Sequence, residues 1–193
     1  MKKLSLLLAA LLILSSTVAC AQWETFKSAD GVYEYTGDGV ITAYYGDEFA
    51  FFPAEIDGTK INEIGVMACF DLGIKYISFA EGIELINTSA FEGCNAESAY
   101  IPPSVKNIGE RAFANCANLK EVTLNSEEIT FDFDVFSGTG FIQFYIPCTA
   151  DEHVMYEKIS DAKGDGNFSF SLMHTSLVES MTEKDIFGEN MIY

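Results

Sequence analysis

The amino-acid sequence predicts a β-rich solenoid, in which short parallel strands stack on one another and a cap closes each end. Two observations carry this prediction. Apolar residues recur at a regular interval through the middle of the chain, as at Ile64, Ile86 and Ile108, and short segments within each period alternate apolar and polar side chains. With 193 residues, 49% of them hydrophobic, the chain has enough apolar surface for one domain of this kind.

The period is clearest in five columns of apolar residues, each occupied in four consecutive repeats. The columns are Ile64, Ile86, Ile108 and Phe131; Ala68, Ala90, Ala112 and Val135; Cys69, Phe91, Phe113 and Phe136; Ile77, Ala99, Val122 and Phe144; and Phe79, Ile101, Leu124 and Ile146. One repeat cannot bury its own apolar edge, so neighbouring repeats have to stack. We therefore expect Phe91 and Phe113 to be buried and stacked in adjacent coils.

The last two columns predict the strands. In each repeat, one residue stands between these two columns and points the other way, as Tyr100 does between Ala99 and Ile101. This alternation has the period of two of a strand with one buried face. Pro102 and Pro147 follow two of these segments and end them, because proline has no N–H to donate. Successive strands are expected to be parallel and about 4.8 Å apart.

The segments outside the repeats are expected to be caps, because an exposed end of a sheet invites aggregation. Residues 22–52 are assigned to an N-terminal capping hairpin, with strands over 32–35 and 40–45 around Gly37-Asp38-Gly39. Residues 149–193 are assigned to a mixed α/β C-terminal cap. Its expected elements are a helix over 150–162, a turn over 163–167, a strand over 168–172 and a second helix over 177–187.

The repeat sequence resembles a known family. The segment from Ile101 to Val122, IPPSVKNIGERAFANCANLKEV, is similar to the repeat of BspA-like leucine-rich-repeat surface proteins, and residues 90–94 repeat its Ala-Phe-x-x-Cys element. Cys69 departs from the motif at the Phe position, and Thr139 replaces the cysteine of the fourth copy. The resemblance covers residues 32–147 and implies a leucine-rich-repeat solenoid, with four to five repeats over residues 53–148. It also implies a surface protein that attaches to host matrix proteins or to other cells.

Residues 1–21 are predicted to be an export signal. Lys2 and Lys3 precede an apolar run over 4–14, and small residues over 15–21 close the segment. Two processing sites remain open. Residues 17–20 resemble a lipobox that would leave a lipid on Cys20, whereas residues 19–21 fit cleavage before Gln22. Both place the mature protein outside the cytoplasm, either released or on the cell surface.

The charge of the chain excludes one class of partner. The formal net charge is −18, and loss of Lys2 and Lys3 with the signal would lower it to −20. Nucleic-acid binding requires a basic face against the phosphates, so no nucleic-acid partner is expected. An anionic membrane would repel this chain as well, so we expect membrane attachment only through a lipid on Cys20.

The cysteines allow two interpretations. Cys94 and Cys116 occupy the same position in consecutive repeats, where a disulfide with a Cα separation of about 5.5 Å is geometrically conceivable. The interpretation we favour is a pair of small buried thiols. Neither a C-x₂-C pair nor a pair of histidines suggests a zinc site.

Catalytic and metal sites are not expected. The two histidines, His153 and His174, both fall in the C-terminal cap, and no nucleophile motif accompanies them. Acidic residues over 132–134 and 161–167 lack the dense ligand spacing of a calcium loop. The sequence therefore predicts a protein that is not an enzyme and that carries no cofactor and no metal.

The outward residues of the strands are the candidate binding site. They form a column of Ser78, Tyr100, Thr123 and Tyr145 on the sheet face. Tyrosines and small polar residues on a rigid sheet suit recognition of an extracellular protein or glycan, although a solvated sheet face has a similar composition. We predict an adhesion or binding module that uses this face. The alternative is a structural envelope lipoprotein without a specific ligand.

Overall fold

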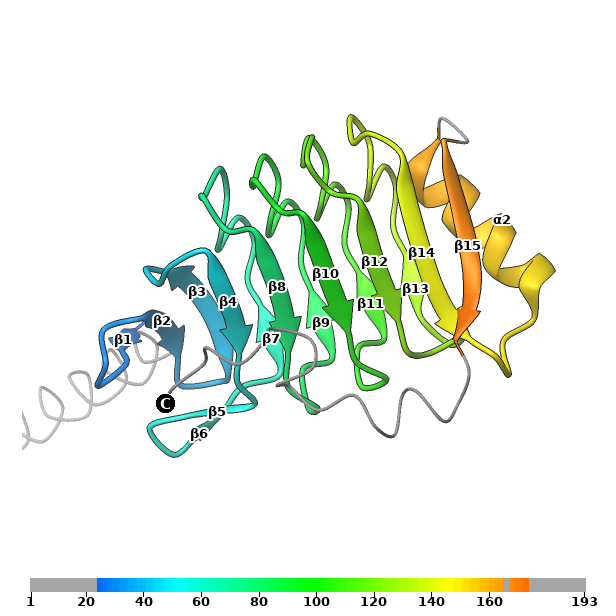
Figure 1. Ribbon diagram of the computed structural model, residues 1–193. Coiled ribbons are helices and arrows are strands. Elements are labelled where there is room, and N and C mark those ends of the chain that lie inside the picture. The colour runs from blue at the N-terminus through cyan, green and yellow to red at the C-terminus, as the bar shows by residue number, and fades with distance from the viewer. Residues whose placement is uncertain (1–23, 165–166, 174–193) are drawn as a thin grey trace, which may run out of the picture.

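Stacked coils of the chain form an elongated solenoid with one β-sheet along each side, in which the strands of successive coils pair in parallel (Figure 1). The computed structural model describes residues 24–164 and 167–173. Within these residues, the six-stranded sheet consists, from the N-terminal coil onwards, of β4 (Phe49–Phe52), β8 (Tyr76–Phe79), β10 (Ser98–Ile101), β12 (Glu121–Leu124), β14 (Ile142–Pro147) and β15 (Phe168–Met173). The seven-stranded sheet consists of β1 (Thr25–Lys27), β2 (Tyr33–Thr36), β3 (Val40–Tyr44), β7 (Glu63–Ile64), β9 (Leu85–Ile86), β11 (Asn107–Ile108) and β13 (Thr130–Phe131). The predicted β-rich solenoid is therefore confirmed.

The coils stack in the register that the repeat columns predict. Ala99 pairs with Ile77 on one side and with Val122 on the other, and Ile86 and Ile108 pair across the short strands. Ala99 and Ile101 are buried, whereas Tyr100 between them is only partly buried. The predicted strand phase is therefore confirmed, with the core enclosed between the two sheets.

A stack of phenylalanine rings fills the centre of the core. Phe91 and Phe113 are fully buried, and their ring centroids lie 5.2 Å apart with nearly parallel planes. Phe113 and Phe136 continue the stack at 5.7 Å. Cys69 occupies the corresponding position of the first coil, where Phe52 and Phe79 pack edge-on against Phe91 instead. The expected stacking of the aromatic column is confirmed from Phe91 to Phe136.

The turns that follow the strands of the seven-stranded sheet are joined by a third set of hydrogen bonds. The amides of Cys69, Phe91 and Phe113 each donate to a carbonyl of the next coil, at 2.8 to 2.9 Å. In each coil the residue two positions before this site and the residue two positions after it take a left-handed backbone conformation. They are Met67, Ser89, Arg111 and Asp134 on one side, and Asp71, Gly93, Asn115 and Gly138 on the other. Because most of these residues are not glycine, the bonds between coils have to offset a local backbone cost.

Cys69, Cys94 and Cys116 are packed inside the coils as free thiols, whereas Cys148 is exposed. Cys94 donates through Sγ to the Cys69 carbonyl at 2.9 Å, and Cys116 donates to the Phe91 carbonyl at 3.1 Å. Burial raises the pKa of Cys94 to about 11 and that of Cys116 to about 12. The interpretation of this pair as small buried thiols is confirmed. In the fourth coil, Thr139 donates to the Phe136 carbonyl and accepts a hydrogen bond from Lys163.

The N-terminal end is closed by the expected hairpin. Strands β2 and β3 pair antiparallel, and Ile41 of β3 then pairs in parallel with Ile64 of β7. The Tyr33 hydroxyl donates to the Phe51 carbonyl, and Tyr44 Oη lies 3.3 Å from the Phe49 carbonyl oxygen. The hairpin therefore extends one sheet and covers the edge of the other.

Strand β4 is the first member of the six-stranded sheet, although residues 49–52 were expected to belong to the capping hairpin. It pairs in parallel with β8, so that Phe52 lies beside Phe79. The small hairpin of β5 (Glu55–Ile56) and β6 (Thr59–Lys60) is inserted between β4 and β7. This insertion makes the interval from Phe52 to Phe79 longer than the interval from Phe79 to Ile101, and so hides the first repeat in the sequence.

A helix replaces the next coil at the C-terminal end. Helix α2 (Glu152–Lys163) begins after the N-cap Asp151, whose carboxylate accepts from two backbone amides, and ends at Gly164 with φ of 75°. The amide of Phe136 donates to the Ala162 carbonyl, as it would to a further coil. Strand β15 then pairs in parallel with β14. The helix expected over 150–162 and the strand over 168–172 are confirmed, and the helix expected over 177–187 lies outside the described residues.

Replacement of Phe91 or Phe113 by Ala is expected to lower the free energy of unfolding by about 3–5 kcal/mol, because a large cavity would remain in the ring stack. Urea denaturation measures this loss. Phe133, which is 71% exposed, provides the matched control, and its change to Ala should cost less than about 0.5 kcal/mol. A loss below about 1 kcal/mol at both buried positions would contradict the assigned stacking.

Candidate functional site

The outer face of the six-stranded sheet carries two columns of outward-pointing side chains. Strand pairing places Phe49, Tyr76, Ser98, Glu121, Gln143 and Ser169 in the first column, and Phe51, Ser78, Tyr100, Thr123, Tyr145 and Ser171 in the second. Large and small residues alternate along the second column. Since neighbouring strands lie about 4.8 Å apart, its aromatic residues recur about every 10 Å.

Four aromatic side chains gather at the N-terminal half of this face. We call Phe49, Phe51, Tyr76 and Tyr100 the aromatic cluster. The rings of Phe49 and Tyr76 stack with centroids 4.9 Å apart, and Phe49 is exposed. Phe51 and Tyr100 lie on the two strands that flank Ser78. The cluster is therefore an aromatic surface held by a rigid sheet.

Three of the four predicted site residues are accessible, and Ser78 is not. Tyr100, Thr123 and Tyr145 are partly exposed in one column on β10, β12 and β14. Ser78 is only 3% exposed, because its neighbours in the column are the much larger Phe51 and Tyr100. The expectation that Ser78 offers a contact surface is therefore wrong. Among the described residues, its Oγ has no hydrogen-bond partner.

The environment of Tyr100 is partly desolvated. Burial, followed by the nearby negative charge of Glu81, raises the pKa of the Tyr100 phenol, so it remains protonated at neutral pH. Tyr100 and Tyr145 are two strands apart, at about 10 Å. One partner can therefore contact both phenols.

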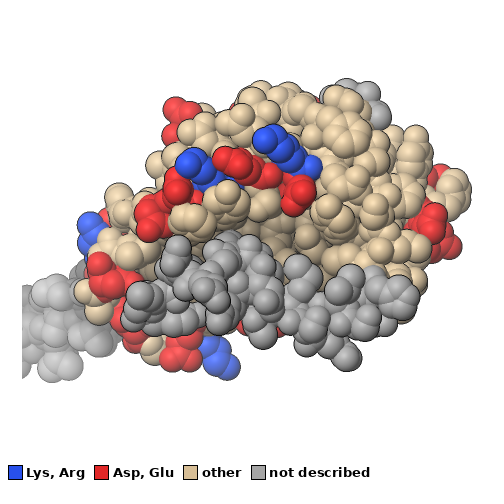
Figure 2. Space-filling model, viewed as in Figure 1, with Lys and Arg blue, Asp and Glu red and all other residues tan. Residues whose placement is uncertain are grey.

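A row of alternating charges borders the two columns at the start of the strands. The backbone bonds of the sheet place Glu48, Lys75, Glu97 and Lys120 side by side in this order. Lys75 Nζ lies 2.5 Å from Glu48 Oε2, and this hydrogen bond raises the pKa of Lys75. Figure 2 shows basic and acidic side chains alternating across this face. The row is locally neutral although the whole chain is strongly acidic.

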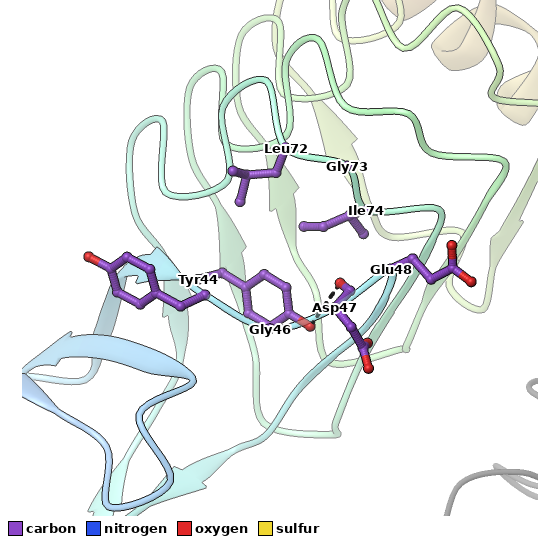
Figure 3. A pocket seen from close by; sticks show the side chains of 8 residues that line it. Tyr44, Gly46, Asp47, Glu48, Leu72, Gly73 and Ile74 are labelled. Atoms are coloured by element: carbon purple, nitrogen blue, oxygen red, sulfur yellow. Dashed lines mark hydrogen bonds between the residues drawn. The ribbon is translucent and has the colours of Figure 1, made fainter.

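A pocket of about 380 Å³ lies between the N-terminal hairpin and the first coil. It is lined by residues 44–48 and 72–74 (Figure 3). The Tyr44 hydroxyl lies 3.3 Å from the Asp47 carbonyl oxygen, and a Cβ at Gly46 would collide with that hydroxyl. Burial raises the pKa of Tyr44. The Tyr44 hydroxyl therefore holds the backbone of the residues that line the pocket. Glu48 belongs both to the pocket lining and to the charged row.

Side chains that could bind a metal ion do not cluster in the described residues. These residues contain no group of three His, Cys, Asp or Glu side chains that could hold a metal ion. His153 is exposed and lies 3.5 Å from Glu157 on the surface of α2, and His174 lies outside the described residues. In the part of the chain that the structure describes, no helix is long and apolar enough to cross a membrane. What the geometry offers is a contact surface.

Sequence reasoning missed Phe49 and Phe51 as surface residues. The alternation Phe49-Ala50-Phe51-Phe52 is a strand signal, and Ala50 and Phe52 are its buried residues. The signal was assigned to the hairpin because the inserted β5 and β6 break the spacing of the repeats. Tyr76 belongs to the outward column next to the predicted site residues, where its ring stacks on Phe49.

The comparisons with known proteins identify the family. Residues 49–156 match the BspA type leucine-rich repeat region in six copies. The chain therefore belongs to the BspA-type leucine-rich-repeat family. Repeats of this family indicate protein binding, proteins that carry them are typically extracellular or on the cell surface, and solenoids of this fold are typically not enzymes.

Solved structures of similar fold come from several bacteria. A leucine-rich repeat protein from Bacteroides capillosus is 24% identical, with a TM-score of 0.49 and coverage of 56% of this chain and 87% of that chain. The leucine-rich repeat protein of T. pallidum is 18% identical, with a TM-score of 0.39 and coverage of 63% and 68%. The pneumococcal vaccine antigen PcpA is 16% identical, with a TM-score of 0.44 and coverage of 78% and 48%. Among curated proteins, none matches this chain.

Replacement of Ser78 by Ala is expected to raise the free energy of unfolding by about 1 kcal/mol, because it removes a buried hydroxyl without a hydrogen-bond partner. Ser98 on the same face is partly exposed and serves as the control, where the change to Ala should be nearly neutral. Thermal and urea denaturation of both variants provide the comparison. Clear destabilisation by Ser78→Ala would show that the hydroxyl is satisfied and that its site is hydrated.

Proposed function

We propose that this protein is an exported cell-surface module that binds an extracellular protein or glycan through the outer face of its six-stranded sheet. The observation that carries the proposal is the pair of outward columns, in which aromatic side chains stand on a rigid parallel sheet. Aromatic residues bury large areas at low entropic cost and dominate the energy of many interfaces. The family supports a binding role, whereas the proposal adds the face, the export and the partner class.

Two features of the face favour contact with a partner over simple solvation. Phe49 remains exposed although it is large and apolar, and Tyr76 holds its ring in place by stacking. The charged row beside it is neutral, so an approaching partner meets little local repulsion. An aromatic centre with a polar border is the arrangement typical of binding interfaces.

The double change Tyr100→Ser and Tyr145→Ser is expected to weaken binding of an identified partner about 100-fold or more, since one aromatic anchor often contributes about 2 kcal/mol. Thermal stability should change little, because both phenols point away from the core. The partner is first identified by capture from panels of extracellular proteins and of purified glycans. Affinity is then measured by surface plasmon resonance for each variant.

The matched control is the double change Val66→Ser and Phe133→Ser. These side chains are apolar and more exposed than the two tyrosines, but they lie on the turns that follow the seven-stranded sheet. Binding should be unchanged in this variant. Equal binding by the tyrosine variant and the wild type would refute the sheet face as the binding site and favour a structural envelope protein.

Export and lipidation are the second part of the proposal, and residues 1–23, on which both rest, lie outside the described residues. We expect Cys20 to be the mature N-terminus and to carry lipid. Mass spectrometry of the protein isolated from its cells tests this expectation. A free N-terminus at Gln22 would contradict lipidation and leave export intact, whereas retention of Met1 would contradict both.

A further inference from the structure

The two edges of the six-stranded sheet differ. At the N-terminal edge, the carbonyls of Glu48 and Phe52 accept hydrogen bonds from the β8 side. Residues of a strand alternate in the direction of their backbone groups, so the carbonyls of Phe49 and Phe51 point to the outer edge. Hydroxyls of Tyr44 and Tyr33 bond these two carbonyls. This edge is therefore blocked by the N-terminal hairpin.

At the C-terminal edge, β15 has one side on which no other described strand pairs. The carbonyls of Asn167 and Met173 accept from β14, so the intervening Phe168, Phe170 and Leu172 direct their N–H and C=O groups away from β14. Among the described residues, β14 is the only strand paired with β15. Three donors and three acceptors thus form a template for a further strand.

The sequence of β15 carries none of the features that discourage edge pairing. Residues 168–173, FSFSLM, include no charge and no proline, and the pairing with β14 has no bulge. Tyr156 of α2 packs against Phe168 and Phe170. Leu172 is left 44% exposed at the far end of the strand. Within residues 24–164 and 167–173, this edge is therefore both unpaired and apolar.

We propose that β15 pairs antiparallel with β15 of a second copy of this chain, about a two-fold axis at Phe170. In a head-to-tail stack of copies, β15 would have to pair with β4 of the next molecule, but the outer edge of β4 is blocked by the N-terminal hairpin. Symmetric pairing places Phe168 opposite Leu172 of the second copy, and each such pair exchanges two backbone hydrogen bonds. The exposed Leu172 side chain is then covered by the other molecule, and the two six-stranded sheets become one.

Charge gives this dimer a distinctive salt dependence. The paired strands are uncharged, but each molecule carries a net charge of −18, so the two bodies repel each other. Salt screens this repulsion and should strengthen the dimer. A basic peptide added to the same edge would instead be held by the acidic body and weakened by salt.

Sedimentation velocity of the purified protein tests the proposal. At concentrations up to about 100 µM we expect a dimer whose dissociation constant falls as salt is raised. Leu172→Pro removes an outward N–H without touching the β14 ladder. It should weaken the dimer at least about tenfold. Leu172→Lys places a charge opposite Phe168 of the second copy and should do the same, while Leu172→Ala should weaken it less. Circular dichroism checks that each variant is folded.

Several outcomes would overturn the proposal. One is a wild-type protein that remains monomeric at high salt. If the amides of Phe168, Phe170 and Leu172 are protected from hydrogen exchange in that monomer, another segment of the same chain covers the edge. A dimer that both Leu172→Pro and Leu172→Lys leave intact would place the contact elsewhere. The dimer does not require the sheet face to bind a partner, so it does not rest on the proposed function. The variants at Tyr100 and Tyr145 leave β15 unchanged, and the two proposals can therefore fail separately.

Discussion

A single coil of this solenoid has no core of its own, so each coil depends on the two that lie against it. Here that dependence is met twice. The ring of Phe113 packs between those of Phe91 and Phe136. The backbone amides of Phe91 and Phe113 donate hydrogen bonds to carbonyls of the next coil. A shift of one residue would break both sets of contacts. Extra residues are therefore accommodated outside the stacked positions, as in the hairpin of β5 and β6.

The same dependence explains the departures from the repeat at the two ends. At the N-terminal end of the ring stack, Cys69 occupies the position that Phe91 and Phe113 hold in the next coils. Phe52 and Phe79 fill the space beside Phe91 from the side of the six-stranded sheet. Above the last coil, Thr139 replaces the cysteine and accepts a hydrogen bond from Lys163 of α2. Each substitution suits the element that takes the place of the missing coil.

The core could be predicted from the sequence because stacking imposes one spacing on every buried column. The surface could be predicted only in part. The burial of Ser78 depends on Phe51 and Tyr100, which are neighbours across strands and are distant in the chain. Phe49 and Phe51 were missed because the insertion of β5 and β6 makes the first interval longer than those that follow. A strand over 168–172 was expected, but its alternation does not indicate that β15 extends the parallel sheet, since pairing is a long-range choice.

Stacking fixes the inward residues and leaves the outward columns free to differ from coil to coil. The outer face therefore holds the differences that can distinguish one partner from another. The net charge of −18 repels anionic surfaces at long range, but this repulsion fades beyond a Debye length of about 8 Å at physiological salt. At contact, the neutral row of Glu48, Lys75, Glu97 and Lys120 adds little net charge beside the aromatic cluster. In the proposed function, overall acidity selects against anionic partners during encounter, and the exposed rings on the sheet face supply the energy of the bound state.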